Sequence, residues 1–324
     1  MYNIAIIGAG QLGSRHLQSL AHLTLPVEIF VIDPSMPSLE VAQQRWREVN
    51  SNPSFRIHFF ESLASLPSSV DVAIVATNAN IRRKVVEQIL QHCRVKFLIL
   101  EKVLFQSIED YDVMRDLMLS KNVTAYVNCP RRMYSYYKNL RDELKNYNTP
   151  LQFNIQGNSW GMGCNIIHFI DLFFFLRDDK ITKTSSLLDE IIHEAKRPGY
   201  IEFTGQYILE NEYGDSFLAI CRDSDIIVPT VITISSSDFT YRIVEAEKIA
   251  FTIHKSGELT TREVVPLYQS QLTEIVVEQL LSTGLCELTP YEESSYLHQI
   301  FLEDFLSHYN SITDNPNNKI CPIT

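Results

Sequence analysis

The chain has 324 residues, of which 45% are hydrophobic and 21% charged, as in ordinary globular proteins. Its formal net charge of −11 argues against nucleic acid and anionic membrane surfaces as partners, because both attract basic patches. Six scattered cysteines without a C-x-x-C pair argue against a disulfide framework or a zinc site. The chain starts with a strand pattern rather than a secretory leader, and its most apolar segment is too short to cross a bilayer, so we expect a cytoplasmic protein.

Strand and helix patterns alternate through the first third of the chain. Apolar strand patterns lie at residues 3–7, 27–32, 55–60, 71–77, 95–100 and 123–127. Amphipathic helix patterns separate them, near residues 11–22, 38–49, 80–92 and 107–120. Strands without polar alternation, joined by helices, predict an α/β fold with a doubly wound parallel sheet, whose ligand crevice lies at the carboxyl ends of the strands.

A glycine motif with the sequence G-A-G-Q-L-G begins at Gly8, directly after the first strand pattern. Gly8 permits a tight turn, Gly10 lets a pyrophosphate approach the backbone, and Gly13 lets the following helix pack on the sheet. We therefore expect the phosphates of a dinucleotide at the helix N-terminus, beside Gly10, Gln11 and Leu12.

Asp33 ends the second strand pattern, 20 positions beyond Gly13. A carboxylate at this spacing typically binds the hydroxyl groups of the adenosine ribose. Its charge would repel a 2′-phosphate, and the next three residues include no arginine that could bind one. The sequence therefore predicts NAD as the cofactor, with NADP the weaker candidate.

The pattern changes after about residue 128. A helix at 133–145 and a strand at 151–157 precede an apolar helix that starts at Gly163. Further strand patterns lie at 200–209, 216–222, 229–235, 239–245 and 248–254, and helix patterns lie near 268–282 and 291–308. We expect an NAD-binding Rossmann domain over residues 1–128, then an α+β domain for substrate binding and oligomerisation over 129–313, with an open, mostly antiparallel sheet. Residues 314–324 are expected to form a poorly ordered tail.

An open sheet leaves an edge or a face that proteins usually cover. We therefore expect a homodimer or homotetramer that associates through the C-terminal sheet. The alternative is that helices of the same domain cover this sheet.

Three groups of polar residues are candidates for chemistry. Lys102, which with Glu101 follows the apolar strand at 95–100, is placed to stabilise alkoxide charge; the alternative is a solvated ion pair. On the apolar helix, one face carries Cys164, Asn165, His168 and Asp171.

His168 is suited to exchanging a hydroxyl proton, and Asp171 to orienting the imidazole or binding a substrate hydroxyl. The alternatives are a core histidine and, less favoured, a His–Asp metal pair, so no metal is expected. The third group is Arg131 and Arg132, which would bind an anionic substrate such as a nucleotide sugar or a uronate. The alternative is that both arginines face solvent at the start of a helix.

Three motifs together resemble the Gfo/Idh/MocA family of glucose–fructose oxidoreductases and inositol dehydrogenases. They are Gly8-x-Gly10-x-x-Gly13-x-x-His16, Glu101-Lys102, and the glycine-rich start of the helix that carries His168-x-x-Asp171. The resemblance extends over nearly the whole chain. It implies that Lys102 and His168 act at a sugar or polyol carbon beside the nicotinamide.

The resemblance also places Thr77, Asn78 and Glu101 among the cofactor-binding residues. It implies a sugar, polyol or nucleotide-sugar substrate, including sugars for surface polysaccharides, and dimeric or tetrameric assembly. Val103, Cys164 and Arg82 depart from the family pattern, which has a proline, an aspartate and a histidine at these positions, and Asn78 also replaces a proline.

These observations predict an NAD-dependent oxidoreductase that transfers a hydride between nicotinamide and a secondary hydroxyl or ketone. Asn165, Asp171, Cys164 and Arg131 are the expected substrate-binding residues. Because Cys164 replaces an aspartate, a non-catalytic NAD- or sugar-sensing regulator on the same fold stays open. NAD-dependent glycoside cleavage or epimerisation is a further alternative.

Overall fold

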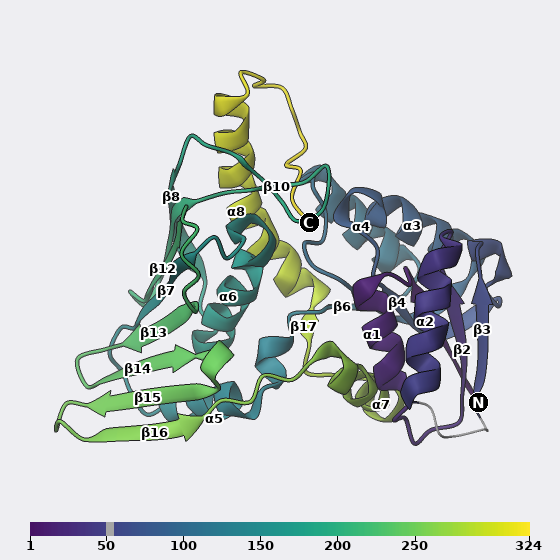
Figure 1. Ribbon diagram of the computed structural model, residues 1–324, viewed down its shortest axis with the longest axis horizontal. Helices are drawn as coiled ribbons and strands as arrows, with labels where there is room; N and C mark the ends of the chain where they lie inside the picture. The colour runs from purple at the N-terminus through teal and green to yellow at the C-terminus, as the bar shows by residue number, and fades with distance from the viewer. Residues whose placement is uncertain (50–54) are drawn as a thin grey trace. The chain divides into compact units, whose positions relative to one another are not determined.

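The computed structural model describes residues 1–49 and 55–324 (Figure 1). The chain divides into two compact units. The first combines Met1–Asn128 with Leu267–Ser295, and the second combines Cys129–Pro266 with Tyr296–Thr324. None of the described helices is long and apolar enough to span a membrane.

The first unit contains a seven-stranded sheet within the described residues, in the order β17-β6-β5-β4-β1-β2-β3. Its strands are β1 (Tyr2–Ile7), β2 (Val27–Ile32), β3 (Arg56–Phe60), β4 (Ser69–Val75), β5 (Arg94–Leu100), β6 (Thr124–Val127) and β17 (Thr289–Pro290). Strands β1 to β6 pair in parallel, and β17 is antiparallel to β6. The predicted parallel sheet is confirmed, and its order reverses at β1, which lies between β2 and β4.

Helices pack on this sheet because its strands are apolar on both faces. The helices of this unit are α1 (Gln11–Leu20), α2 (Met36–Val49), α3 (Ala79–His92), α4 (Glu109–Ser120) and α7 (Thr273–Thr283), of which α7 packs on α1. The last four residues of β4 are completely buried, and α1 buries Leu17 and Leu20. Figure 1 shows α1 beside α2.

Helix α7 belongs to the first unit, although the sequence placed it in the 129–313 domain. Its N-terminal turn is bonded to α1, because the Glu274 N–H donates to Ser19 Oγ at 3.0 Å. The Thr24 N–H donates to Glu278 Oε1 at 2.7 Å. The periodicity of the sequence predicted the helix, but periodicity does not identify the core against which a helix packs.

The second unit contains an eight-stranded sheet within the described residues, in the order β16-β15-β14-β13-β7-β12-β11-β8. Its strands are β7 (Gln152–Asn158), β8 (Ile181–Leu188), β11 (Gly205–Asn211), β12 (Ser216–Arg222), β13 (Val231–Ser235), β14 (Phe239–Val244), β15 (Ile249–His254) and β16 (Leu259–Glu263). Only β7 and β12 pair in parallel among these described neighbours. The prediction of a mostly antiparallel sheet is confirmed.

The strand predicted at 200–209 is interrupted. It forms β10 (Ile201–Glu202), which pairs with β9 (His193–Glu194), and then β11. The break lies at residues 203–204, directly before Gly205, where φ is +112° and a Cβ would lie 2.4 Å from the Leu187 carbonyl oxygen. The short two-stranded hairpin is therefore separate from the large sheet.

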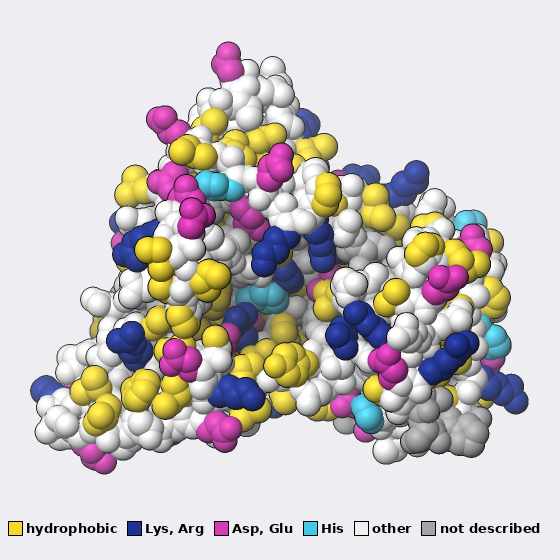
Figure 2. Space-filling view, in the orientation of Figure 1, with side chains coloured by type: hydrophobic (Ala, Val, Ile, Leu, Met, Phe, Trp, Pro, Cys, Tyr) yellow, Lys and Arg dark blue, Asp and Glu magenta, His cyan; other side chains and the backbone are white. Residues whose placement is uncertain are grey.

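One face of the large sheet is covered by α6 (Met162–Arg177) and α8 (Tyr291–Ile312), while α5 (Ser135–Leu144) packs on α6. Phe173 of α6 contacts Phe153 and Phe217, and Phe305 of α8 contacts Tyr207. The opposite face exposes apolar side chains, including Ile253 and Leu259. Figure 2 shows hydrophobic side chains among charged ones over the strands β13 to β16.

The expectation of a poorly ordered tail at 314–324 is wrong. Cys321 and Ile323 are fully buried, and the Ile201 N–H donates to the Pro322 carbonyl at 2.9 Å. The Asn318 amide donates to the Ile320 carbonyl at 2.8 Å. Asparagine and proline therefore form turns in this segment, which the two apolar side chains anchor.

Candidate functional site

The glycine turn at the end of β1 combines close packing with an open approach to the backbone. A Cβ at Gly13 would lie 1.8 Å from the Gly8 carbonyl oxygen, so only glycine lets α1 begin here. Gly8 has a φ of +93°, which favours glycine. By contrast, a Cβ at Gly10 would meet no described atom within 4 Å. The side of Gly10 is therefore open to a ligand at the α1 N-terminus.

Asp33 at the end of β2 is tied to this turn. Its Oδ2 accepts a hydrogen bond from the Ala9 N–H at 2.6 Å, and its Oδ1 accepts one from the Ser35 N–H at 2.8 Å. The carboxylate is only half-buried. Its position is therefore fixed relative to the glycine turn, while part of its surface stays accessible.

A cavity of about 800 Å³ lies at the carboxyl ends of these strands. Five predicted cofactor residues line it: Gly8, Gly10, Asp33, Thr77 and Asn78. Glu61, Ser62, Gln88 and His92 also line it, and the sequence analysis did not identify them. The only available signal was that Glu61 and Ser62 directly follow β3, since such positions border the crevice of a parallel sheet.

Gln11 is held by a residue that the sequence analysis also missed. The Arg45 guanidinium on α2 donates to the Gln11 carbonyl at 3.1 Å and to Gln11 Oε1 at 2.6 Å. Arg45 therefore fixes the first residue of α1 from the neighbouring helix. Leu12, which is half-buried, follows in the same turn.

Glu101 lies in a buried polar cluster rather than among the residues that line the cavity. Its Oε1 is 2.9 Å from His16 Nε2 and accepts a bond from Asn128 Nδ2 at 2.5 Å. Burial raises the pKa of Glu101, but these bonds and the charge of Lys102 outweigh burial and bring it below its ordinary value. Glu101, which follows β5, therefore connects His16 of α1 with Asn128, which follows β6. Lys102 is half-buried, and its peptide bond to Val103 is cis.

In the second unit, three predicted substrate-site residues line one pocket of about 320 Å³: Arg131, Asn165 and His168. Trp160, Phe169, Thr230 and Glu245 complete much of its wall. The pocket therefore combines hydrogen-bonding groups with aromatic surface, as small-molecule sites commonly do.

Arg131 already has a carboxylate partner. Its Nε and Nη2 donate to the two carboxylate oxygens of Glu245 at 2.9 and 2.7 Å, and Tyr137 Oη donates to Glu245 at 2.6 Å. Burial raises the pKa of Glu245, but Arg131 and Tyr137 outweigh burial and lower it. The pair is thus ionised and internally neutral, so Arg131 is not the unpaired cation that an anionic substrate would require.

Asp171 does not line this pocket, contrary to its expected role as a substrate ligand. It is fully buried, and its two oxygens accept bonds from Arg132 Nε and Nη2, both at 2.8 Å. Helical spacing placed Asp171 one turn from His168, but the buried face of α6 includes this position as well. Asp171 and Arg132 instead connect α6 to the segment that precedes α5.

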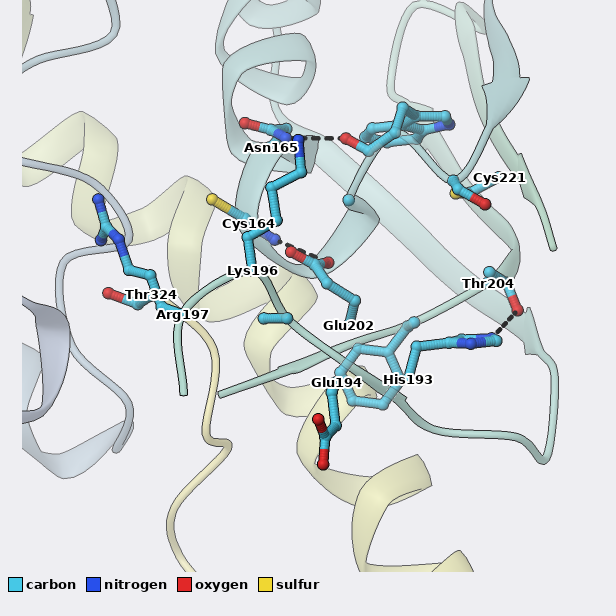
Figure 3. Close-up of a pocket in the computed structure, with 15 residues that line it drawn as sticks. Cys164, Asn165, His193, Glu194, Lys196, Arg197, Glu202, Thr204, Cys221 and Thr324 are labelled. Atoms are coloured by element: carbon cyan, nitrogen blue, oxygen red, sulfur yellow. Dashed lines mark hydrogen bonds between the residues drawn. The ribbon is translucent and has the colours of Figure 1, made fainter. Parts of the chain in front are cut away.

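A second pocket, of about 470 Å³, lies beside the N-terminus of α6 (Figure 3). Its lining includes Cys164, and Asn165 and Trp160 line both pockets. The Asn165 side-chain amide donates to the Trp160 carbonyl at 2.8 Å. Asn165 is therefore fixed at the partition between the two pockets.

Glu202 of β10 brings a carboxylate to this helix N-terminus. Its Oε2 accepts a bond from the Cys164 N–H at 3.3 Å, as Figure 3 shows. A Cβ at Gly161 or Gly163 would lie 3.1 or 3.0 Å from its oxygens, so both glycines make room for it. The sequence analysis missed Glu202, because nothing in the spacing connects it with Cys164.

The family model described as "Oxidoreductase family, NAD-binding Rossmann fold" (Gfo/Idh/MocA) matches residues 2–129. No curated protein matches the chain. Among solved structures, the chain is similar to an oxidoreductase from Agrobacterium radiobacter in complex with NAD+, L-tartaric acid and magnesium. The identity is 14% over 98% of this chain and 96% of that chain, with a TM-score of 0.71.

UDP-N-acetylglucosamine 3-dehydrogenase from Acidithiobacillus ferrooxidans is 14% identical, covering 97% of this chain and 99% of that chain, with a TM-score of 0.70. A super-repressor mutant of Gal80p from Saccharomyces cerevisiae is 12% identical, covering 98% of this chain and 100% of that chain, with a TM-score of 0.73. Identities this low establish a shared fold alone. The family model covers residues 2–129, so it identifies this N-terminal part of the chain, which includes the glycine turn, with the NAD-binding Rossmann fold of that oxidoreductase family.

Proposed function

We propose that the protein is an NAD-dependent oxidoreductase that acts on a secondary hydroxyl or ketone of a sugar, polyol or sugar derivative. The observation that carries this proposal is the link between the glycine turn and Asp33 at the edge of the 800 Å³ cavity. The open side of Gly10 suits a pyrophosphate, and the α1 N-terminus supplies N–H groups for its charge.

NAD is favoured over NADP because of the charge at Asp33. Its carboxylate would accept bonds from the ribose hydroxyls and repel a 2′-phosphate. Calorimetry with both cofactors tests this, and NAD should bind at least about tenfold more tightly. Asp33→Asn keeps an oxygen that can accept from Ala9 but removes the charge, so it should reduce the preference. Equal affinities in the wild-type protein would contradict it.

Bound NAD would accept or donate the hydride. Side chains of the protein would transfer the hydroxyl proton and stabilise the charge on the reacting oxygen. His168 exchanges the hydroxyl proton, and Lys102 stabilises negative charge on the reacting oxygen. Asn165 binds a neighbouring hydroxyl. The neutral Arg131–Glu245 pair offers donors and acceptors to further hydroxyls, which favours an uncharged polyhydroxy group in this pocket.

The test starts with mass spectrometry of small molecules released when the purified protein is denatured. Sugars and polyols related to any released compound are then assayed for NAD+ reduction. Lys102→Ala and His168→Ala should each lower kcat by about 10²- to 10⁴-fold. Lys121→Ala, at the exposed end of α4, is the matched control. Full turnover in both site variants would refute the two catalytic roles.

A non-catalytic NAD- or sugar-binding regulator is the second candidate, favoured by Cys164 at a position where the family motif has an aspartate. A regulator would bind NADH without chemistry. Deuterium transfer from labelled NADH to a keto sugar, followed by mass spectrometry, distinguishes the two candidates. Transfer excludes the regulator.

The open sheet face supports association into a homodimer or homotetramer. A hollow of about 610 Å³ on the sheet is lined by Val231, Phe251, Ile253 and Leu259 among other residues. Nearby Ile227 is 97% exposed. Light scattering at micromolar concentration should therefore detect a dimer or tetramer, and a monomer would contradict this assembly.

A further inference from the structure

Arg82 connects the ends of two neighbouring parallel strands. It lies in the first turn of α3 and is only 1% exposed. Its Nη2 donates to the carbonyl of Thr77, which follows β4. Its Nη1 donates to the carbonyls of Val103 and Leu104, which follow β5, with a distance of 2.8 Å to Leu104. One side chain thus fixes the backbone of both loops.

Both loops lie on the side of the sheet where the nicotinamide half of a dinucleotide is expected. The sheet order reverses at β1, with β2 on one side and β4 and β5 on the other. A dinucleotide lies across such a switch point, and its adenosine ribose meets the acid at the end of β2. The loops after β4 and β5 therefore border the other half, where Thr77 lines the cavity and Lys102 precedes Val103.

The chemistry of arginine suits this connection. A guanidinium is planar and carries donors on separate nitrogens, so it can bond carbonyls of two loops at once. A lysine ammonium is a point charge on a flexible stem and cannot reproduce this fork. Burying a cation is costly unless its hydrogen bonds are made, so the carbonyl positions and the guanidinium stabilise one another.

We infer that Arg82 is a positioning residue: it sets the Thr77 loop and the Lys102–Leu104 segment as one wall for the nicotinamide half of the cofactor. This inference rests on the proposed binding of NAD. It predicts that Arg82 contributes to the affinity for the nicotinamide half and not to that for the adenosine diphosphate half.

The experiment compares the affinities for NADH and ADP-ribose, which lacks the nicotinamide, by calorimetry. The proteins are the wild type, Arg82→Lys, Arg82→Met and the control Arg83→Gln. Arg83 is the next residue of α3, and it pairs with Glu87 and Asp110 near the surface. Both Arg82 variants should weaken NADH binding by about tenfold or more, as expected for lost bonds to a charged donor.

ADP-ribose affinity should stay within about twofold in every variant, which also shows that the variants are folded. Arg83→Gln should leave both affinities unchanged. An unchanged ratio of the two affinities in both Arg82 variants would overturn the inference. A purely structural role would weaken both ligands equally, and that result would overturn it too.

A measurement on the wild-type protein covers the case in which the Arg82 variants do not fold. Hydrogen exchange followed by mass spectrometry should show that NADH slows exchange in residues 77–82 and 101–106 more than ADP-ribose does. Equal protection by both ligands would overturn the inference. If the wild-type protein binds neither ligand, the proposed function fails first, and the inference fails with it.

Discussion

Arg132 and Asp171 form a bidentate salt bridge inside the second unit, with both nitrogen–oxygen distances at 2.8 Å. Asp171 is fully buried. Asp171→Asn should therefore lower the free energy of unfolding by about 3–5 kcal/mol, because it leaves a buried guanidinium without its counter-charge. Urea denaturation measures this loss. Glu245→Gln is the comparison, since that pair is 17% and 19% exposed and should cost less. A larger loss in Glu245→Gln would contradict the ranking.

Substitutions at two glycines of the turn distinguish its role in packing, at Gly13, from its role in cofactor binding, at Gly10. Gly13→Ala should destabilise the protein by several kcal/mol, since its Cβ would lie 1.8 Å from a carbonyl oxygen. Gly10→Ala meets no described atom within 4 Å, so the melting temperature without cofactor should barely change. Its methyl group would nevertheless obstruct the pyrophosphate and weaken NAD binding by about tenfold or more. Unchanged NAD affinity in Gly10→Ala would place the phosphates elsewhere.

Cys164 and Glu202 can be tested as a pair at the α6 N-terminus. Cys164→Asp would place a second carboxylate beside Glu202, so we expect it to destabilise the wild-type protein through like-charge repulsion. In a Glu202→Gln background the same substitution should stabilise the helix, because an acid in the first turn complements its dipole. A double-mutant cycle should give a coupling of at least about 0.5 kcal/mol. Additive effects would show that the two positions do not interact.

Glu101 makes stability depend on acid pH. Burial raises its pKa, but hydrogen bonds with His16 and Asn128 and the charge of Lys102 outweigh burial, so its net pKa is below the ordinary 4.5. A carboxyl group with a lowered folded-state pKa stabilises the fold above its unfolded pKa. This contribution is lost as pH falls through the folded-state pKa.

Urea denaturation at several values from pH 7 down to about pH 3 measures this contribution. Glu101→Gln should reduce the dependence of unfolding free energy on pH below about 4.5, and it should be less stable than the wild type at pH 7. Identical slopes for the two proteins in the acid range would contradict the assignment.

The parallel strands of the first sheet were predictable because most contain a run of consecutive apolar residues, as in β4, which ends V-A-I-V, and β5, which ends F-L-I-L. In the second unit, β8 and β16 were missed, since their sequences, I-T-K-T-S-S-L-L and L-T-T-R-E, are mostly polar and half or more exposed. Such edge strands form because a neighbouring strand supplies hydrogen-bond partners. That information is not contained in their own periodicity.

The site was predictable where one short motif holds its own geometry. The glycine turn and Asp33 are an example, because their spacing follows from one strand–helix–strand unit. The bidentate partners of Arg131 and Asp171 were not predictable, since Glu245 and Arg132 reach them from separate elements. Glu202 was missed for the same reason. Helical spacing identified a shared face for His168 and Asp171, but packing decided which side chain borders a pocket.

Strand β17 closes the edge of β6, and Gln269 and Thr273 reach the ring of His16. During synthesis, the glycine motif is therefore translated early, whereas residues 267–295 of the same unit are translated near the end of the chain. A fragment that stops at Asn128 would possess every residue of the phosphate-binding turn and still have a bare sheet edge. Producing the nucleotide-binding half in isolation would require residues 267–295 to be supplied as a second piece or joined by a new linker.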